Sequence, residues 1–179
     1  MTINVKEKTM VKPAEKSPRQ WLWMSILDMM NNPNHVPLIY FYRSNGASNF
    51  FDANVLKQAL SKVLVTFYPL AGRFRLDGGG RIEIDCNDEG VLFVTAETSY
   101  VIDSVGDFAP TPEIRRLIPT VDYSLGISSY PFLLIQFTTL RAAAAARVPR
   151  RMGRGRKRKR SEEERLVDFL HVSKAWWVY

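Results

Sequence analysis

Hydrophobic side chains recur at helical spacing between positions 53 and 67, and this stripe predicts the longest helix of the chain. Asp52 can cap its first turn, Phe51 before the cap can pack on Leu56, and Pro69 ends it. The stripe consists of Val55, Leu56, Ala59, Leu60, Val63, Leu64 and Phe67. A helix with one apolar face needs a second layer to cover that face.

Runs of β-branched and aromatic residues predict strands on both sides of this helix. These runs are residues 3–10, 36–43, 73–76, 81–86, 91–96 and 131–139. The run 36–43 (VPLIYFYR) is interpreted as a buried strand, and the segment 77–80 (DGGG) as a hairpin turn between two runs. Residues 111–117 are expected to form a short helix with Pro112 in its first turn. More strands than helices indicate an α/β fold of the α+β kind, a mixed sheet covered by helices.

Charge divides the chain into two parts. Of the 179 residues, 25 are Lys or Arg and 18 are Asp or Glu, which gives a net charge of +7. Residues 1–140 hold 13 basic and 14 acidic side chains, a balance of −1, whereas residues 141–179 hold 12 and 4, a balance of +8. The sequence therefore predicts a folded part, 1–140, and a divergent basic tail, 141–179. The run 147–160, with nine Lys or Arg in fourteen positions, has no apolar periodicity and is expected to be disordered.

Composition excludes several classes of protein. An apolar content of 46% is that of a globular chain and not of a fully disordered one. No apolar run approaches the roughly 18 residues that indicate a membrane span, and the polar residues 1–18 do not resemble a signal peptide. One cysteine, Cys86, cannot form an intramolecular disulfide, which suits a reducing compartment. We expect a soluble cytoplasmic protein, with nuclear import through 147–160 as the alternative.

Few side chains offer chemistry. The two histidines, His35 and His171, have no cysteine or carboxylate at ligand spacing, so no metal site is expected. The glycines at 78–80 lack the Lys-Ser/Thr of a phosphate loop and are interpreted as turn residues. A cluster of carboxylates is expected to be solvated in a turn: Asp85, Asp88 and Glu89. His35, at a strand entrance, suits either a structural role or a place in a pocket, and no orienting partner is visible near it in the sequence.

A heptapeptide at 67–73 (FYPLAGR) resembles a hallmark of the plant BAHD acyltransferases, enzymes that use acyl-CoA. Further stretches agree in order and spacing, among them HVPLIYFYR at 35–43, RIEIDCNDEGVLFVTAE at 81–97 and GDFAPTPEIRRLIPTVDY at 106–123. The resemblance extends from Thr2 to about Leu140. It is greatest with the members of the family that transfer hydroxycinnamoyl groups to shikimate or quinate.

The resemblance implies a fold and a reaction. Members of this family have two domains of similar size, each a mixed sheet with helices, as in chloramphenicol acetyltransferase. The chain then corresponds to a partial N-terminal domain of that fold. A histidine of an HxxxD motif removes a proton from the acceptor hydroxyl, and the oxygen attacks the acyl-CoA thioester. The implied partners are acyl-CoA, as a co-substrate, and a hydroxyl acceptor, with no metal and no other cofactor.

The chain departs from the family pattern after Leu140. No HxxxD motif occurs, because the fourth positions after His35 and His171 are Ile39 and Ala175, and the DFGWG motif of the second domain is also absent. The resemblance therefore assigns no catalytic residue. Two substrate-binding candidates carry over from the stretch H-x-P-x-x-Y, namely His35 and Tyr40. Leu38 stands where close relatives carry a small polar residue, which puts acceptor contacts at that position in doubt.

Two questions stay open at the level of sequence. The tail 141–179 comes either from a frameshift, a retained intron or a mis-predicted gene model, or it is a selected basic segment. The function is either acyl transfer by descent, inactive in this chain without HxxxD and a second domain, or that of a non-enzymatic basic protein. In the second case 147–160 would bind nucleic acid or an import receptor.

Overall fold

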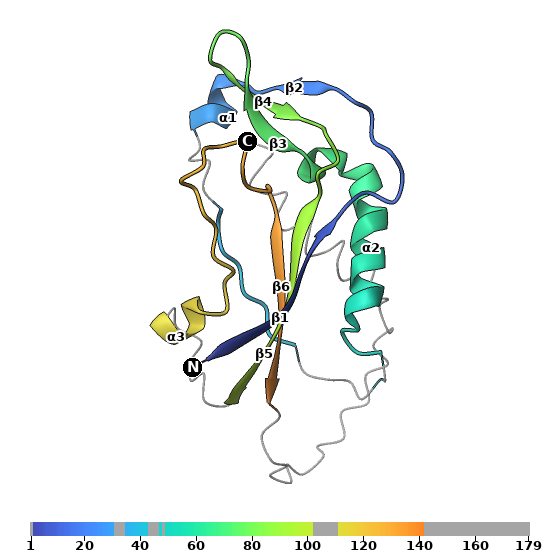
Figure 1. Cartoon of the computed structure of the whole chain (residues 1–179), viewed down its shortest axis with the longest axis vertical. Helices are drawn as coiled ribbons and strands as arrows, with labels where there is room; N and C mark the ends of the chain where they lie inside the picture. The colour runs from blue at the N-terminus through green and yellow to red at the C-terminus, as the bar shows by residue number, and fades with distance from the viewer. Residues whose placement is uncertain (1, 31–34, 43–46, 48, 102–110, 142–179) are drawn as a thin grey trace, which may run out of the picture.

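The computed structural model describes residues 2–30, 35–42, 47, 49–101 and 111–141 (Figure 1). The elements are β1 (Ile3–Val11), β2 (Trp21–Trp23), α1 (Ile26–Met30), α2 (Ala53–Thr66), the 3-10 helix η1 (Tyr68–Ala71), β3 (Arg73–Leu76), β4 (Ile82–Asp85), β5 (Val91–Val101), α3 (Pro112–Arg115) and β6 (Leu134–Arg141). The expected disorder of 147–160 concerns residues outside the described ranges.

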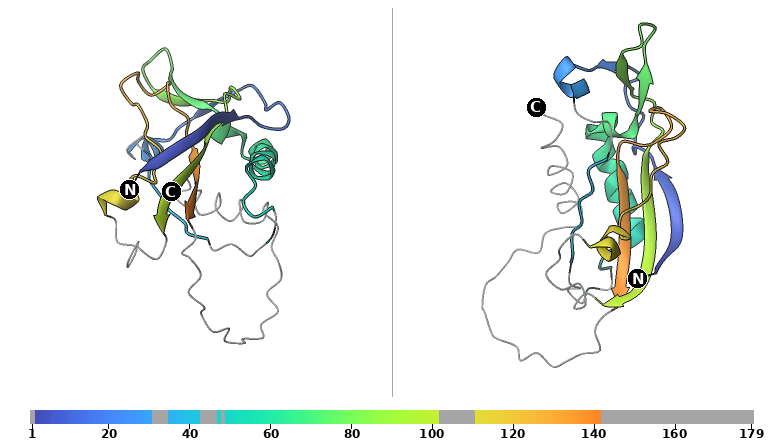
Figure 2. Two further views of the ribbon diagram at one scale, coloured as in Figure 1. Left: turned by 60° about the horizontal axis from the view of Figure 1, so that its bottom comes forward. Right: turned by 90° about the vertical axis from the view of Figure 1, so that its left-hand side faces the viewer.

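The larger sheet has the strand order β1-β5-β6. β1 runs antiparallel to β5, with Ile3 opposite Thr98, and β6 runs parallel to β5, with Leu92 opposite Leu134. One antiparallel and one parallel pair make this a mixed sheet, so the predicted α/β class is confirmed. A smaller antiparallel sheet, β2-β4-β3, lies beside α1 at one end of the molecule (Figures 1 and 2).

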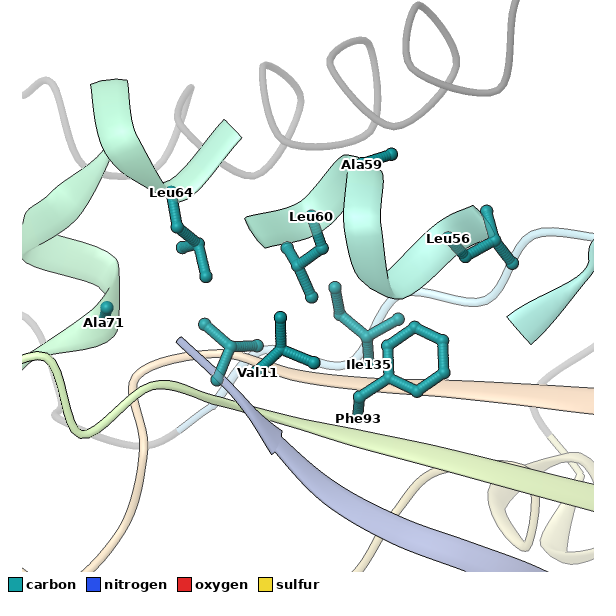
Figure 3. Close-up of a cluster of buried hydrophobic side chains, with 9 residues drawn as sticks. Val11, Leu56, Ala59, Leu60, Leu64, Ala71, Phe93 and Ile135 are labelled. Carbon is teal, nitrogen blue, oxygen red and sulfur yellow. The ribbon is translucent and has the colours of Figure 1, made fainter. Parts of the chain in front are cut away.

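Helix α2 covers one face of the larger sheet, as its apolar stripe predicts (Figure 3). Asp52 caps the helix, because its side chain accepts hydrogen bonds from the backbone N–H groups of Asn54 and Val55. Leu56, Leu60 and Leu64 point from the helix toward the strands, where Val11, Val91, Phe93 and Ile135 complete a buried cluster. The partly buried Phe51 packs on the same cluster. The capped start and the apolar face both agree with the sequence-based expectation.

A second cluster connects the smaller sheet to the stretch that precedes β6. Met24, Phe74 and Tyr130 form its buried centre, and Val121, Ile127 and Phe132 are among the side chains around it. Phe74 of β3 meets Phe132 edge to face, with ring centroids 4.5 Å apart. Through this cluster, residues 121–132 are packed against the small sheet.

The expected buried strand at 36–43 is wrong for residues 36–42, the part of it that the structure describes. These residues form no strand, and Val36, Leu38, Tyr40 and Tyr42 are all exposed. β-branched and aromatic residues favour an extended chain, but a strand also needs a neighbouring strand to pair with. The ladders among the described residues join only β1 with β5, β5 with β6, β2 with β4, and β3 with β4. Two short elements, β2 and α1, were not predicted from the sequence.

Candidate functional site

The two residues expected to bind substrate lie on segment 35–42, and His35 fixes its beginning. The Nδ1 atom of the His35 ring lies 2.8 Å from the Tyr123 hydroxyl, and Nε2 lies 2.7 Å from the Pro131 carbonyl oxygen. The ring also packs against Tyr130, with centroids 5.5 Å apart. We call this group, His35 with Tyr123, Tyr130 and Pro131, the histidine clasp.

The partners in the clasp were not found from the sequence. Tyr123 and Pro131 lie 88 and 96 residues from His35, in the connection between α3 and β6. Burial lowers the pKa of His35, and the hydrogen bond to the Pro131 carbonyl acts in the opposite direction. Because both ring nitrogens have internal partners, His35 does not present a free base to a substrate.

Ring contacts hold the other end of the segment. Tyr42 packs on Phe51 with centroids 4.9 Å apart, and Phe51 packs on Phe137 of β6 at 5.5 Å. Tyr40 lies 6.5 Å from Tyr42 by the same measure. Segment 35–42 is therefore anchored by side chains at its beginning and at its end.

Between these anchors the segment presents a row of apolar side chains to solvent. Val36 is 62% exposed, Leu38 and Tyr40 are each 43% exposed, and Tyr42 is 47% exposed. We call these four residues the apolar row. Tyr40, the second substrate-binding candidate, is thus accessible.

The expected solvation of the carboxylate cluster is wrong for two of its three members. Asp85 and Asp88 are only partly exposed, because Asp85 ends β4 and lies 3.4 Å from Arg19, while Asp88 accepts a hydrogen bond from the backbone of Ser17. Glu89 is exposed, as expected. Within the ranges that the structure describes, no group of three or more His, Cys, Asp or Glu side chains is placed to hold a metal ion.

The FYPLAGR motif forms a structural junction. Arg73 is buried, and its Nη1 donates hydrogen bonds to the carbonyl oxygens of Gly72 and Gly90, at 2.7 and 2.9 Å. Its Nε lies 3.0 Å from a carboxylate oxygen of Glu89. Burial lowers the pKa of Arg73, and the charge of Glu89 partly restores it. The motif therefore ties the end of α2 to the start of β5 and does not line the candidate site.

Gly72 connects η1 to β3 at a point where another strand passes close to its backbone. Its backbone is extended, with φ −88° and ψ −166°, so the residue does not make a tight turn. A Cβ atom at Gly72 would instead lie 2.4 Å from the carbonyl oxygen of Asp85. Glycine is needed because β4 passes so close to this backbone.

The glycine-rich segment between β3 and β4 is a hairpin turn, as predicted. The backbone N–H of Asp77 donates to the Arg81 carbonyl at 2.8 Å, and Gly80 has a positive φ of 80°. The Asp77 carboxylate accepts hydrogen bonds from the backbone N–H groups of Arg81 and Gly79, which lower the pKa of Asp77. These N–H groups are used inside the turn.

The comparisons with known proteins agree on one family. The model of the transferase family matches residues 1–145. Over 138 residues the chain is 59% identical to shikimate O-hydroxycinnamoyltransferase of Nicotiana tabacum. This alignment covers 77% of the chain and 32% of the tobacco protein. It is 56% identical over 139 residues to a hydroxycinnamoyltransferase of Narcissus pseudonarcissus, with coverages of 77% and 32%. Rosmarinate synthase of Plectranthus scutellarioides is 50% identical over 147 residues, with coverages of 82% and 34%.

Comparison with solved structures also points to this family. The structure aligns with the crystal structure of vinorine synthase at a TM-score of 0.58 and 25% identity, over 78% of the chain and 35% of that protein. The chain thus spans about a third of the length of the relatives that it matches. These matches do not favour the alternative of a nucleic-acid-binding protein, which depends on residues 147–160. No helix in the described part of the chain is long and apolar enough to cross a membrane. The chain belongs to the transferase family of BAHD acyltransferases.

Proposed function

We propose that residues 1–140 form part of the N-terminal domain of a hydroxycinnamoyl-CoA-dependent acyltransferase and contribute to its acceptor-binding wall. The observation that carries this proposal is the identity of 59% and 56% to two hydroxycinnamoyltransferases over the same part of the chain. The implied donor is a hydroxycinnamoyl-CoA, and the implied acceptor is a hydroxyl compound such as shikimate or quinate. Residues 141–179 are then a divergent basic tail.

Acyl transfer needs a general base, and this sequence lacks the HxxxD motif whose histidine serves as that base in the family. A histidine takes the proton of the acceptor hydroxyl, the oxygen forms a bond to the thioester carbonyl carbon, and the C–S bond of the tetrahedral intermediate breaks to release CoA. The sequence contains no HxxxD motif, and His35 is held by internal hydrogen bonds. We therefore expect no turnover by the 179-residue chain itself.

Segment 35–42 is the part of the structure that we assign to the acceptor. Tyr40 offers an aromatic ring and a hydroxyl at an exposed position between two anchored ends. Leu38, which is also exposed, offers only apolar contact, so at that position the wall would contact the ring of an acceptor and not its hydroxyl groups. His35 belongs to the same wall at its fixed end.

A chimeric enzyme tests the proposal. The matched 138 residues of the tobacco shikimate O-hydroxycinnamoyltransferase are replaced by those of this chain, and release of CoA from p-coumaroyl-CoA is followed with shikimate as acceptor. We expect an active chimera. Tyr40→Phe should raise the KM for shikimate about tenfold, since one lost hydrogen bond is worth about 1.4 kcal/mol. Tyr100→Phe, in β5 and outside segment 35–42, is the matched control for loss of a tyrosine hydroxyl.

The purified 179-residue chain provides the complementary test. With p-coumaroyl-CoA and shikimate we expect the rate of the uncatalysed reaction. Turnover that disappears in His35→Ala would show that a base is present and would contradict our assignment. A soluble but inactive chimera would contradict the proposed role of residues 1–140.

We also propose a cytoplasmic location. Cys86 is a free, buried thiol, and burial together with the charges of Asp85 and Asp88 raises its pKa. Such a thiol is stable in a reducing compartment. Fractionation of plant cells that express the tagged chain checks the location, and a nuclear signal lost on deletion of 147–160 would contradict it.

A further inference from the structure

We infer that His35 is a positioning residue: its neutral imidazole joins the Tyr123 hydroxyl to the Pro131 carbonyl and so fixes the segment that carries Tyr40. The effect on acceptor binding rests on the proposed function. The arrangement of the clasp itself rests on the structure alone. This inference gives His35 a role through Tyr40 in place of direct contact with the acceptor.

The hydrogen-bond partners define the tautomer. A carbonyl oxygen only accepts, so Nε2, 2.7 Å from the Pro131 oxygen, carries the proton. The neutral ring then has its lone pair on Nδ1, 2.8 Å from the Tyr123 oxygen, and the phenol O–H donates to it. The same phenol oxygen also lies 3.4 Å from the His35 backbone N–H, which can only donate. Tyr123 thus accepts from the backbone and donates to the ring, which is consistent with the neutral form.

The surroundings of the ring also favour the neutral form. Tyr123, Tyr130 and the Pro131 carbonyl are the groups that the described contacts place against the imidazole, and none of them carries a charge at neutral pH. Burial lowers the pKa of His35 and also raises that of Tyr130. Protonation would place a charge in this group of rings and would remove the lone pair that accepts from Tyr123.

Side-chain contacts, and not the backbone hydrogen bonds of a strand ladder, hold segment 35–42 in place. Segment 35–42 belongs to none of the strand ladders described for the chain. The clasp at His35 and the contact of Tyr42 with Phe51 are two of the contacts that hold it. Tyr40 lies five residues after His35, so loss of the clasp removes one of the contacts that fix the backbone before Tyr40. The inference therefore predicts a change at Tyr40 without any contact between His35 and the acceptor.

NMR of the full 179-residue chain tests the clasp directly. The chain contains two histidines, so ¹⁵N-labelled imidazole gives two sets of signals, which His35→Gln assigns by difference. We expect the neutral Nε2–H tautomer at pH 7 and a pKa of His35 below 6.5. In Tyr123→Phe the donor to Nδ1 is lost, so the pKa of His35 should rise. An Nδ1–H tautomer, or a pKa of His35 that Tyr123→Phe leaves unchanged, would overturn the inference.

Kinetics in the chimera test the consequence for binding. His35→Gln and Tyr123→Phe should each raise the KM for shikimate about fivefold to tenfold, the effect of one hydrogen bond, while the KM for p-coumaroyl-CoA stays unchanged. The KM for shikimate should also rise as the pH falls through the lowered pKa of His35, because protonation removes the lone pair that accepts from Tyr123, and His35→Gln should remove this dependence. Tyr100→Phe, outside the clasp, controls for general effects of removing a hydroxyl.

The two experiments separate the possible failures. An inactive parent chimera contradicts the proposed function. The NMR experiment then still tests the clasp, because it does not depend on activity. An active chimera in which both clasp variants keep the parent KM for shikimate overturns the positioning role. If the clasp variants raised the KM for shikimate and the KM for p-coumaroyl-CoA together and also lowered the unfolding midpoint, His35 would have only a structural role. That result would also overturn the positioning role.

Discussion

Replacement of Leu60 by alanine tests whether the packing of α2 on the larger sheet holds this chain together. Leu60 is 0% exposed and points from the helix into the cluster that contains Val11 and Ile135 (Figure 3). Truncation to alanine removes three carbon groups, a loss of about 2.4 kcal/mol of transfer free energy at about 0.8 kcal/mol per group. The cavity left between a helix and a sheet adds to this loss. We expect the free energy of unfolding to fall by about 3–4 kcal/mol.

Urea unfolding of the 179-residue chain, followed by circular dichroism, measures this change. With an m-value of about 1.5–2 kcal/mol/M, the midpoint should fall by roughly 2 M. Leu76→Ala, at a leucine that is 54% exposed at the end of β3, is the matched control and should change the free energy by less than about 0.5 kcal/mol. If Leu60→Ala and Leu76→Ala had equal effects, the helix–sheet interface would not be the core of the fold.

Three further substitutions probe other parts of the structure. Gly72→Ala should lower the free energy of unfolding, measured in urea, by about 2 kcal/mol or more, because the new Cβ would lie 2.4 Å from the carbonyl oxygen of Asp85. Gly78→Ala is the control and should be tolerated, because no atom lies within 4 Å of its new Cβ. Asp52→Ala should cost about 1 kcal/mol by the same assay, since two backbone N–H groups of α2 lose their acceptor, and an unchanged midpoint would contradict the cap. Leu38→Ser should raise the concentration at which light scattering detects association, without a change of midpoint, because it interrupts the exposed apolar row; association that is independent of this position would argue against the row as its cause.

Local signals in the sequence were sufficient for the elements that local chemistry determines. The cap at Asp52 and the apolar stripe located α2 almost to the residue, and the glycines between Asp77 and Arg81 located a hairpin. Local signals were insufficient where pairing with a distant strand decides whether a segment becomes a strand. Residues 36–43 have the composition of a strand but no neighbouring ladder, whereas Trp21–Trp23 is a strand of only three residues because β4, about 60 positions away, lies beside it.

The candidate site shows the same limit more clearly. The family resemblance singled out His35 and Tyr40, and the structure places both on one anchored segment. Tyr123 and Pro131, which lie within hydrogen-bond distance of the two ring nitrogens of His35, were not identified as its partners from the sequence. A contact between residues about 90 positions apart depends on how α3 and the stretch before β6 return to the sheet, and no short pattern in the sequence encodes that path.

The strand order β1-β5-β6 has a consequence for the synthesis of the protein on the ribosome. The central strand β5 pairs Thr98 with Ile3, so β1 finds its neighbour only after about 95 more residues have been added. At about 5–20 residues per second, this delay is roughly 5–19 seconds, far longer than the microseconds that a helix such as α2 needs to form. During that interval β1 lacks its partner strand, and its unpaired backbone groups are a template for pairing with another protein.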